Sequence, residues 1–157
     1  MQIGKHFEEH VVGDKIETWG RTITETDVIN FVTLTGFVEP LFFDQEYVRR
    51  ESIFKGRVAP GILVFSYAEG LTAQTGILHG TGLAFMGLDK LFVRAPILVG
   101  DTIRVEIEVV ETNPGRRPDG GRVRYRHLVK NQRDETVLEY EATRLIKKRS
   151  VSPAPPG

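Results

Sequence analysis

The stretch PGILVFSYAEGL (residues 60–71) decides the fold, because it predicts a helix that is apolar on nearly every side. Pro60 suits the first turn of a helix, where its missing N–H costs no hydrogen bond. A helix that is apolar all round must be buried by the rest of the protein. The run is well short of the roughly 20 apolar residues that a membrane-spanning helix requires.

Helices are also predicted before this stretch. Thr24-Glu-Thr-Asp27 matches a capping box, with Asp in place of the usual Glu or Gln. Apolar residues at helical spacing follow, and Gly36 is placed to end the helix. A second, short polar helix is expected from Asp44 to about Ser52. The first half of the chain is therefore mostly helical.

After the apolar helix the period changes to that of strands. Apolar and charged residues alternate from Ile103 to Val109, which is typical of a half-buried strand. Residues 122–130 and 136–147 are also read as strands, and residues 83–92 and 15–23 are weaker candidates. We expect the last four strands to follow one another in antiparallel order and to curl around the apolar helix. This is an α+β architecture.

Composition excludes several classes of protein. The chain has 157 residues, with 21 Lys and Arg against 21 Asp and Glu, and lacks the basic excess typical of nucleic-acid or anionic-membrane binding. It has no cysteine, so disulfides, thiolate catalysis and Cys-based zinc sites are excluded. The four histidines show no metal-ligand spacing, and no metal is expected. We expect one domain over residues 1–147, a flexible tail over 148–157 and a cytoplasmic location.

Two segments resemble the MaoC-like dehydratases, a hot-dog-fold family that includes the (R)-specific enoyl-CoA hydratases. The first is FVTLTGFVEPLFFD (residues 31–44) with GRVAPGIL (residues 56–63), where the family has Gly-Asp-x-Asn-Pro-Leu/Ile-His-x-Asp and then Arg-x-x-His-Gly-Met/Ile-Leu. The second is LFVRAPILVGDTIRVEIE (residues 91–108), which is similar to the family's Phe-x-x-Pro-Val-x-x-Gly-Asp pattern. The positions that match the first pattern are Gly36, Pro40, Leu41, Asp44, Arg57 and Gly61.

The resemblance implies a hot-dog fold and reversible hydration of trans-2-enoyl-CoA to (R)-3-hydroxyacyl-CoA. However, the family's catalytic Asp and His correspond to Phe37 and Phe42 here, and its Asn corresponds to Glu39. Phenyl rings cannot accept or donate the protons that hydration moves, so we expect this activity to fall to near background. The family's oxyanion donor is a backbone N–H, which corresponds to Gly61 and survives any change of side chain.

Each candidate site residue also has a structural interpretation. Phe37 and Phe42 either line an acyl pocket or fill the space of the missing polar pair. Glu39 is a displaced general base or a solvent-facing carboxylate. Glu69 lies in the apolar helix, where other hot-dog enzymes, the thioesterases, place a catalytic acid; alternatively it pairs with an arginine or faces a dimer partner.

The leading hypothesis is a protein that binds an acyl thioester, carried by CoA or by a carrier protein, without a cofactor. One alternative is an acyl-CoA thioesterase that uses Glu69, and another is a non-catalytic partner subunit of a dehydratase. Arg57, Lys90 and Arg94 could contact CoA phosphates or be ordinary charges. A homodimer or higher homo-oligomer is expected, because a single sheet around one helix leaves an edge strand and apolar surface exposed.

Overall fold

The computed structural model describes residue 1 and residues 3–54 and 56–150, so residues 151–157 of the predicted tail lie outside the described residues. The elements in chain order are η1 (Phe7–Glu9), β1 (Lys15–Glu17), β2 (Arg21–Thr22), α1 (Glu25–Thr35), α2 (Pro40–Phe43), α3 (Gln45–Glu51), α4 (Gly61–Gln74), β3 (Gly82–Val93), β4 (Thr102–Asn113), β5 (Gly120–Lys130) and β6 (Thr136–Lys147). Within the described residues, no helix has the length and apolar character needed to cross a bilayer.

The strands form one antiparallel sheet in the order β1-β4-β5-β6-β3, with β2 also paired to β4. The predicted succession is confirmed for β4, β5 and β6. It is wrong for β3, which pairs with β6 at the far edge of the sheet. Sequence periodicity identifies a strand but contains no information about its neighbour, so this crossing could not be predicted.

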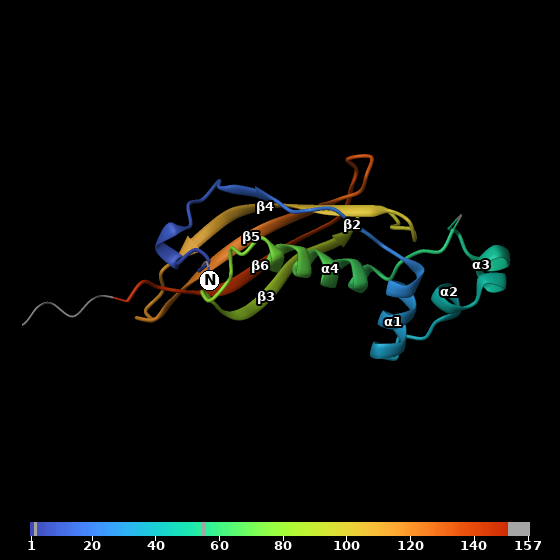
Figure 1. Ribbon diagram of the computed structural model, residues 1–157, viewed down its shortest axis with the longest axis horizontal. Helices are drawn as coiled ribbons and strands as arrows, with labels where there is room; N and C mark the ends of the chain where they lie inside the picture. Colours follow the sequence, from blue (N-terminus) through green and yellow to red (C-terminus); the bar gives the residue numbers. More distant parts are fainter. Residues whose placement is uncertain (2, 55, 151–157) are drawn as a thin grey trace, which may run out of the picture.

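The core lies between the sheet and α4, which runs across the concave face of the sheet (Figure 1). Every second residue of β4 from Ile103 to Val109 is at most 3% exposed, as the alternation predicts. The buried face of α4 consists of Leu63, Val64, Ala68, Leu71 and Thr72. A curved antiparallel sheet around one apolar helix is the hot-dog fold, and the α+β prediction is confirmed.

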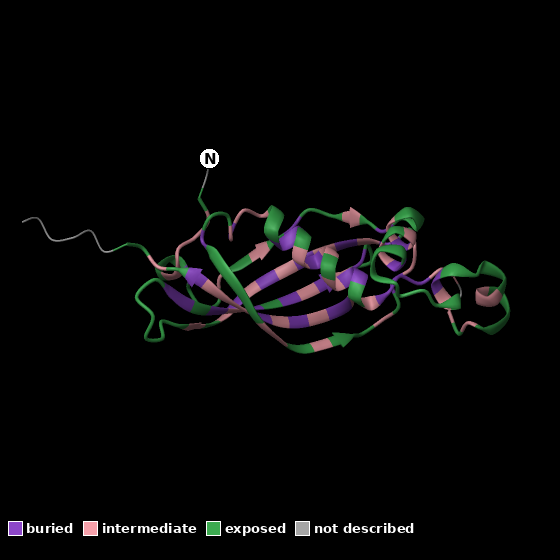
Figure 2. Cartoon of the chain, turned by 90° about the horizontal axis from the view of Figure 1, so that it is seen from below, coloured by how far each residue is buried: buried purple, intermediate pink, exposed green. Residues whose placement is uncertain are grey.

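The opposite side of α4 is open, which corrects the expectation of a helix buried all round. Ile62 is 54% exposed, and Ser66, Gly70 and Ala73 are also exposed. Figure 2 shows exposed and buried stretches following one another along this helix. One chain therefore leaves one side of α4 uncovered.

The helices α1, α2 and α3 gather beyond the end at which α4 begins (Figure 1). The capping box before α1 is confirmed, since Thr24 and Asp27 each accept a hydrogen bond from the other's amide. Gly36 ends this helix with φ +73°, a conformation that favours glycine. The polar helix is confirmed as α3, with Asp44 as its N-cap. The four-residue helix α2 between them was not predicted.

Candidate active site

The first feature of the candidate site is the start of α4 at Gly61. The first intrahelical hydrogen bond runs from the Val64 amide to the Pro60 carbonyl, 3.2 Å, so the amides of residues 61–63 precede the helical ladder. These N–H groups form the positive end of the helix dipole. A Cβ on residue 61 would lie 3.0 Å from Val93 Cγ2, so glycine allows α4 to begin close to the end of β3.

Phe37 and Phe42 are neighbours, as their correspondence to a catalytic pair requires. Their ring centroids lie 5.6 Å apart with the planes tilted by 44°. Phe42 is 8% exposed and belongs to the hydrophobic core, whereas Phe37 is 46% exposed. Phe42 thus fills space in the core, and Phe37 is the ring that remains available at the surface.

Glu39 is an exposed residue at the N-cap of α2. Its carbonyl accepts a hydrogen bond from the Phe42 amide, 2.9 Å, but its side chain makes no capping hydrogen bond. The structure thus favours the solvent-facing interpretation of this carboxylate.

Glu69 lies at the centre of a polar cluster beneath α4. Its Oε1 accepts a hydrogen bond from the Tyr140 hydroxyl, 2.8 Å, and its Oε2 accepts one from Arg144 Nη2. His127 Nε2 lies 3.8 Å from Oε1. Both oxygens of Glu69 are therefore engaged inside the chain, and the pairing with an arginine is the interpretation that the structure supports.

Sequence reasoning missed the other members of this cluster. Tyr140 and His127 occupy inward-facing positions of β6 and β5, directly opposite each other in the sheet. The sequence did offer one signal. His127 is a polar residue two positions after Tyr125, so it shares the inward face of an alternating strand, where apolar residues are usual.

Burial fixes the protonation states of His127 and Tyr140. His127 is fully buried, and its ring stacks on Tyr140 with centroids 4.3 Å apart. Burial, with a smaller contribution from the Arg144 charge, lowers the pKa of His127 to about 3, so the imidazole is neutral at pH 7. Burial and the Glu69 charge raise the pKa of Tyr140 far above its usual value, so its hydroxyl stays a hydrogen-bond donor.

The three cations proposed for CoA phosphates are engaged by groups within the chain. Arg57 binds Glu25, Lys90 lies 3.1 Å from Glu141, and Arg94 lies 2.5 Å from Glu139. Arg57 is also mostly buried, with a side chain 10% exposed. The structure therefore gives Arg57 an internal role.

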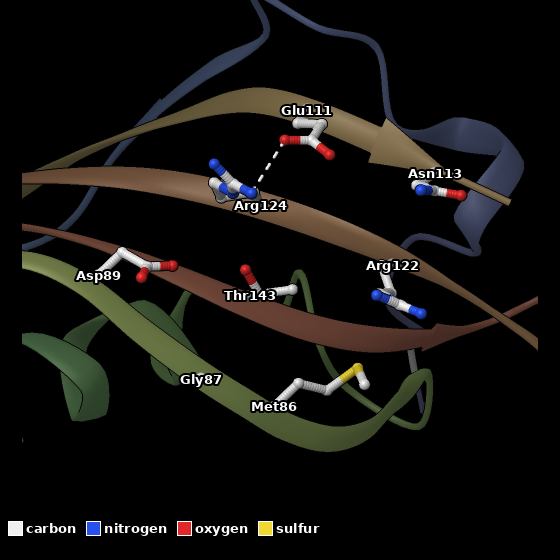
Figure 3. A pocket seen from close by; sticks show the side chains of 8 residues that line it. All are labelled: Met86, Gly87, Asp89, Glu111, Asn113, Arg122, Arg124 and Thr143. Carbon is white, nitrogen blue, oxygen red and sulfur yellow. Dashed lines mark ion pairs between the residues drawn. The ribbon is translucent and has the colours of Figure 1, made fainter. Parts of the chain in front are cut away.

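The surface hollows described below lie away from Phe37, Phe42 and Gly61. One of about 260 Å³ is on the outer face of the sheet, where Arg124 pairs with Glu111 at 3.1 Å (Figure 3). Five hollows on the described residues are lined by other side chains, and none of these five includes Phe37, Phe42 or Gly61. These parts of the candidate site thus lie outside the five hollows. The part of the chain that the structure describes also contains no group of three or more metal-ligating side chains placed to hold an ion.

Comparisons with known proteins agree with this architecture. The family model described as "MaoC like domain" matches residues 7–131. Protein MaoC of Klebsiella aerogenes is 37% identical over 103 residues, which are 66% of this chain but only 30% of that protein. The 3-hydroxybutyryl-CoA dehydratase of Methylorubrum extorquens is 32% identical over 151 residues, 94% of this chain and 88% of the relative.

A solved structure described as a monoamine oxidase regulatory protein from Archaeoglobus fulgius superposes with a TM-score of 0.87. It is 36% identical in sequence, and the match covers 95% of this chain and 98% of that one. The family model, the relatives and the superposition lead to one conclusion: this chain belongs to the MaoC-like domain family.

Proposed function

We propose that this protein binds an acyl thioester whose carbonyl oxygen accepts a hydrogen bond from the Gly61 amide. The observation that carries the proposal is the start of α4, where this N–H precedes the helical ladder at the positive end of the dipole. A dehydratase of a CoA thioester is among the relatives, which supports a thioester as the ligand. The amide polarises the carbonyl without any side chain, so this interaction is independent of the residues at positions 37 and 42.

We further propose that ordinary hydration is lost. Adding water to an enoyl thioester requires one group that deprotonates water and one that protonates the α-carbon. Phe37 and Phe42 supply neither, and their ring centroids lie 5.6 Å apart. Each missing acid–base group typically costs about 10²–10⁴-fold in rate. Thioester binding therefore remains while turnover falls to near background.

The functional unit we propose is a homodimer in the cytoplasm, formed along β3. This edge strand exposes large apolar side chains: Leu83, Phe85, Met86, Phe92 and Val93. Ile62 adds to them from the open side of α4. A second copy would cover this surface and enclose the site that one chain leaves open.

A matched pair of variants at residue 61 tests the role of the amide. Gly61→Ala keeps the N–H, whereas Gly61→Pro removes it, and proline is tolerated at the first position of a helix. Both are made with Val93→Ala, because a Cβ at residue 61 would lie 3.0 Å from Val93 Cγ2. Calorimetric titration with butyryl-CoA should show affinity about tenfold weaker for the proline variant than for the alanine variant. Equal affinities would contradict the role of the amide.

Activity assays test the second part of the proposal. Absorbance of the enoyl thioester should show near-background hydration of crotonyl-CoA and of longer enoyl-CoAs. Rapid turnover that Glu39→Ala abolishes would instead establish Glu39 as a replacement base. Release of free thiol from acyl-CoAs that is lost in Glu69→Gln would establish the thioesterase alternative. A stable hetero-oligomer on co-purification, in place of a homodimer, would support the partner-subunit alternative.

A further inference from the structure

We propose that Arg57 is a positioning residue, which holds the Phe37–Phe42 pair at a fixed place relative to the start of α4. This inference rests on the proposed function, since the pair and Gly61 belong to the same thioester site. It assigns Arg57 a role in the geometry of the site, in place of a contact with the phosphates of CoA.

The contacts of the Arg57 guanidinium join α1 to α2. Nη2 donates a hydrogen bond to the Phe42 carbonyl, 2.6 Å, and Nη1 donates one to Glu25 Oε1. The Phe42 carbonyl lies at the end of α2, where carbonyls have no partner within a helix. Glu25 is the first residue of α1. One side chain thus fixes both helices to each other.

The backbone of Arg57 is itself anchored to the body of the protein. Its carbonyl accepts a hydrogen bond from the Val99 amide, 2.8 Å, and the next residue, Val58, forms a β-bridge with Leu98. The Ala59 amide donates to the Ile97 carbonyl, also 2.8 Å. The chain then reaches Pro60 and α4 directly. Because its backbone is fixed to the segment at residues 97–99 and its side chain binds the Phe42 carbonyl, Arg57 holds α2 at a fixed position relative to that segment.

A second link ties the first turn of α1 to α4. The Tyr67 hydroxyl donates a hydrogen bond to Asp27 Oδ1, 2.9 Å. The Arg21 guanidinium lies 3.6 Å from the centroid of the Tyr67 ring and also donates to Asp27, 3.3 Å. The first turn of α1 is consequently joined to α2 through Glu25 and Arg57, and to α4 through Asp27 and Tyr67.

The short helix α2 depends on such links for its position. It has four residues, of which only Phe42 is buried, and helices of this length do not form without tertiary contacts. Arg57 is well suited to the task because a planar guanidinium presents several donors in fixed directions. Removing it leaves the Phe42 side chain in the core but frees the α2 backbone and the connection before it, which bears Phe37.

Hydrogen–deuterium exchange tests the positioning role without any ligand. Arg57→Met should lower protection about tenfold in peptides covering residues 37–51, with peptides from α4 and β4–β6 unchanged. Arg57→Lys should restore part of that protection, and Glu25→Gln should lose less than Arg57→Met. Arg124→Met is the control, because Arg124 pairs with Glu111 and Glu141 on the outer face.

Binding of butyryl-CoA, measured well below the melting temperature, gives the functional readout. Arg57→Met should weaken affinity about tenfold, with partial rescue in Arg57→Lys and no change in Arg124→Met. Unchanged exchange in residues 37–51, or an equal increase in every peptide, would overturn the positioning role. If Arg57→Met does not fold, Arg57→Lys and Glu25→Gln carry the same test. Absence of binding in the parent protein would instead refute the proposed function, while the exchange result would still decide the role of Arg57.

Discussion

The body of sheet and α4 and the end formed by α1, α2 and α3 are held together by different forces. In the body, apolar side chains pack between two large surfaces, and residues such as Leu63, Val105 and Leu138 are fully buried. The end buries few side chains, and α3 buries none. Val28, Val32 and Phe42 reach the common core, and charged groups add further links, chiefly Arg57 with Glu25 and Arg21 with Asp27.

This difference shows where the chain tolerates a change of chemistry. In the body, Glu69 accepts hydrogen bonds from Tyr140 and Arg144, while the ring nitrogens of the buried His127 have no hydrogen-bond partner in the described structure. The end carries Phe37 and Phe42 where the resemblance to the family places a proton-transferring pair. We therefore expect a change at the exposed Phe37 to disturb the sheet and α4 less than a change at Phe42, which belongs to the hydrophobic core.

Restoring the polar pair should have the largest effect. In the double variant Phe37→Asp/Phe42→His the two positions could again handle protons, because the parent rings already lie 5.6 Å apart. Hydration of crotonyl-CoA should rise about 10²-fold or more above the parent. Each single variant serves as a control and should gain much less. A folded double variant without added turnover would show that the end no longer presents these positions to a substrate.

Truncation of a leucine in each region compares the two directly. Leu63→Ala in α4 should lower the free energy of unfolding by about 2–5 kcal/mol, because the side chain is fully buried. Leu34→Ala in α1 should change it by less than about 0.5 kcal/mol, since Leu34 is 86% exposed. Urea denaturation measures both. A comparable loss in the two variants would mean that Leu34 is covered in solution, for example by a second copy.

The elements that sequence predicts are those with local signals. The capping box at Thr24 and Asp27 with Gly36 defines α1, and alternation from Ile103 to Val109 defines β4. The apolar run after Pro60 defines α4. In each case the residues that determine the structure lie within about 12 positions of one another.

Features that depend on distant residues were missed. β3 pairs with β6, which follows it by more than 40 residues, and Arg144 pairs with Glu69 from 75 residues away. The helix α2 has four residues, too few for a periodic pattern to identify it. Of the candidate site, sequence anticipated the proximity of Phe37 to Phe42 and the helix start at Gly61, but not the links through Arg57 that surround them.

The buried cluster should make the body sensitive to acid. His127 has a folded-state pKa of about 3, below the ordinary value of about 6.5, so the unfolded chain binds a proton that the folded chain excludes. This imidazole therefore costs no stability at high pH and lowers stability as pH falls from 6.5 toward 3. Between pH 7 and pH 5 the loss due to His127 should be about 2 kcal/mol.

Urea denaturation of the parent and of His127→Phe at the two pH values checks this prediction. Phenylalanine keeps a ring stacked on Tyr140 but cannot be protonated. The carboxylates titrate in both proteins, so the difference between them isolates the histidine. An identical pH dependence in parent and variant would show that His127 is not protected from protonation in the folded protein.

The variant with the smallest predicted effect tests whether α1–α3 unfold together with the sheet and α4. Thr24→Ala removes the hydroxyl that accepts a hydrogen bond from the Asp27 amide, and it should lower the free energy of unfolding by about 1 kcal/mol. Thr26→Ala, at an exposed position of the same turn, is the control and should not change it measurably. Val28 and Val32 of α1 are fully buried in the common core, so the loss should lower the urea midpoint of the whole protein. Hydrogen exchange that increased only in α1–α3, with the urea midpoint unchanged, would instead show that the end is a separate cooperative unit. In that case the charged links through Arg57 and Asp27 would be its main attachment to α4.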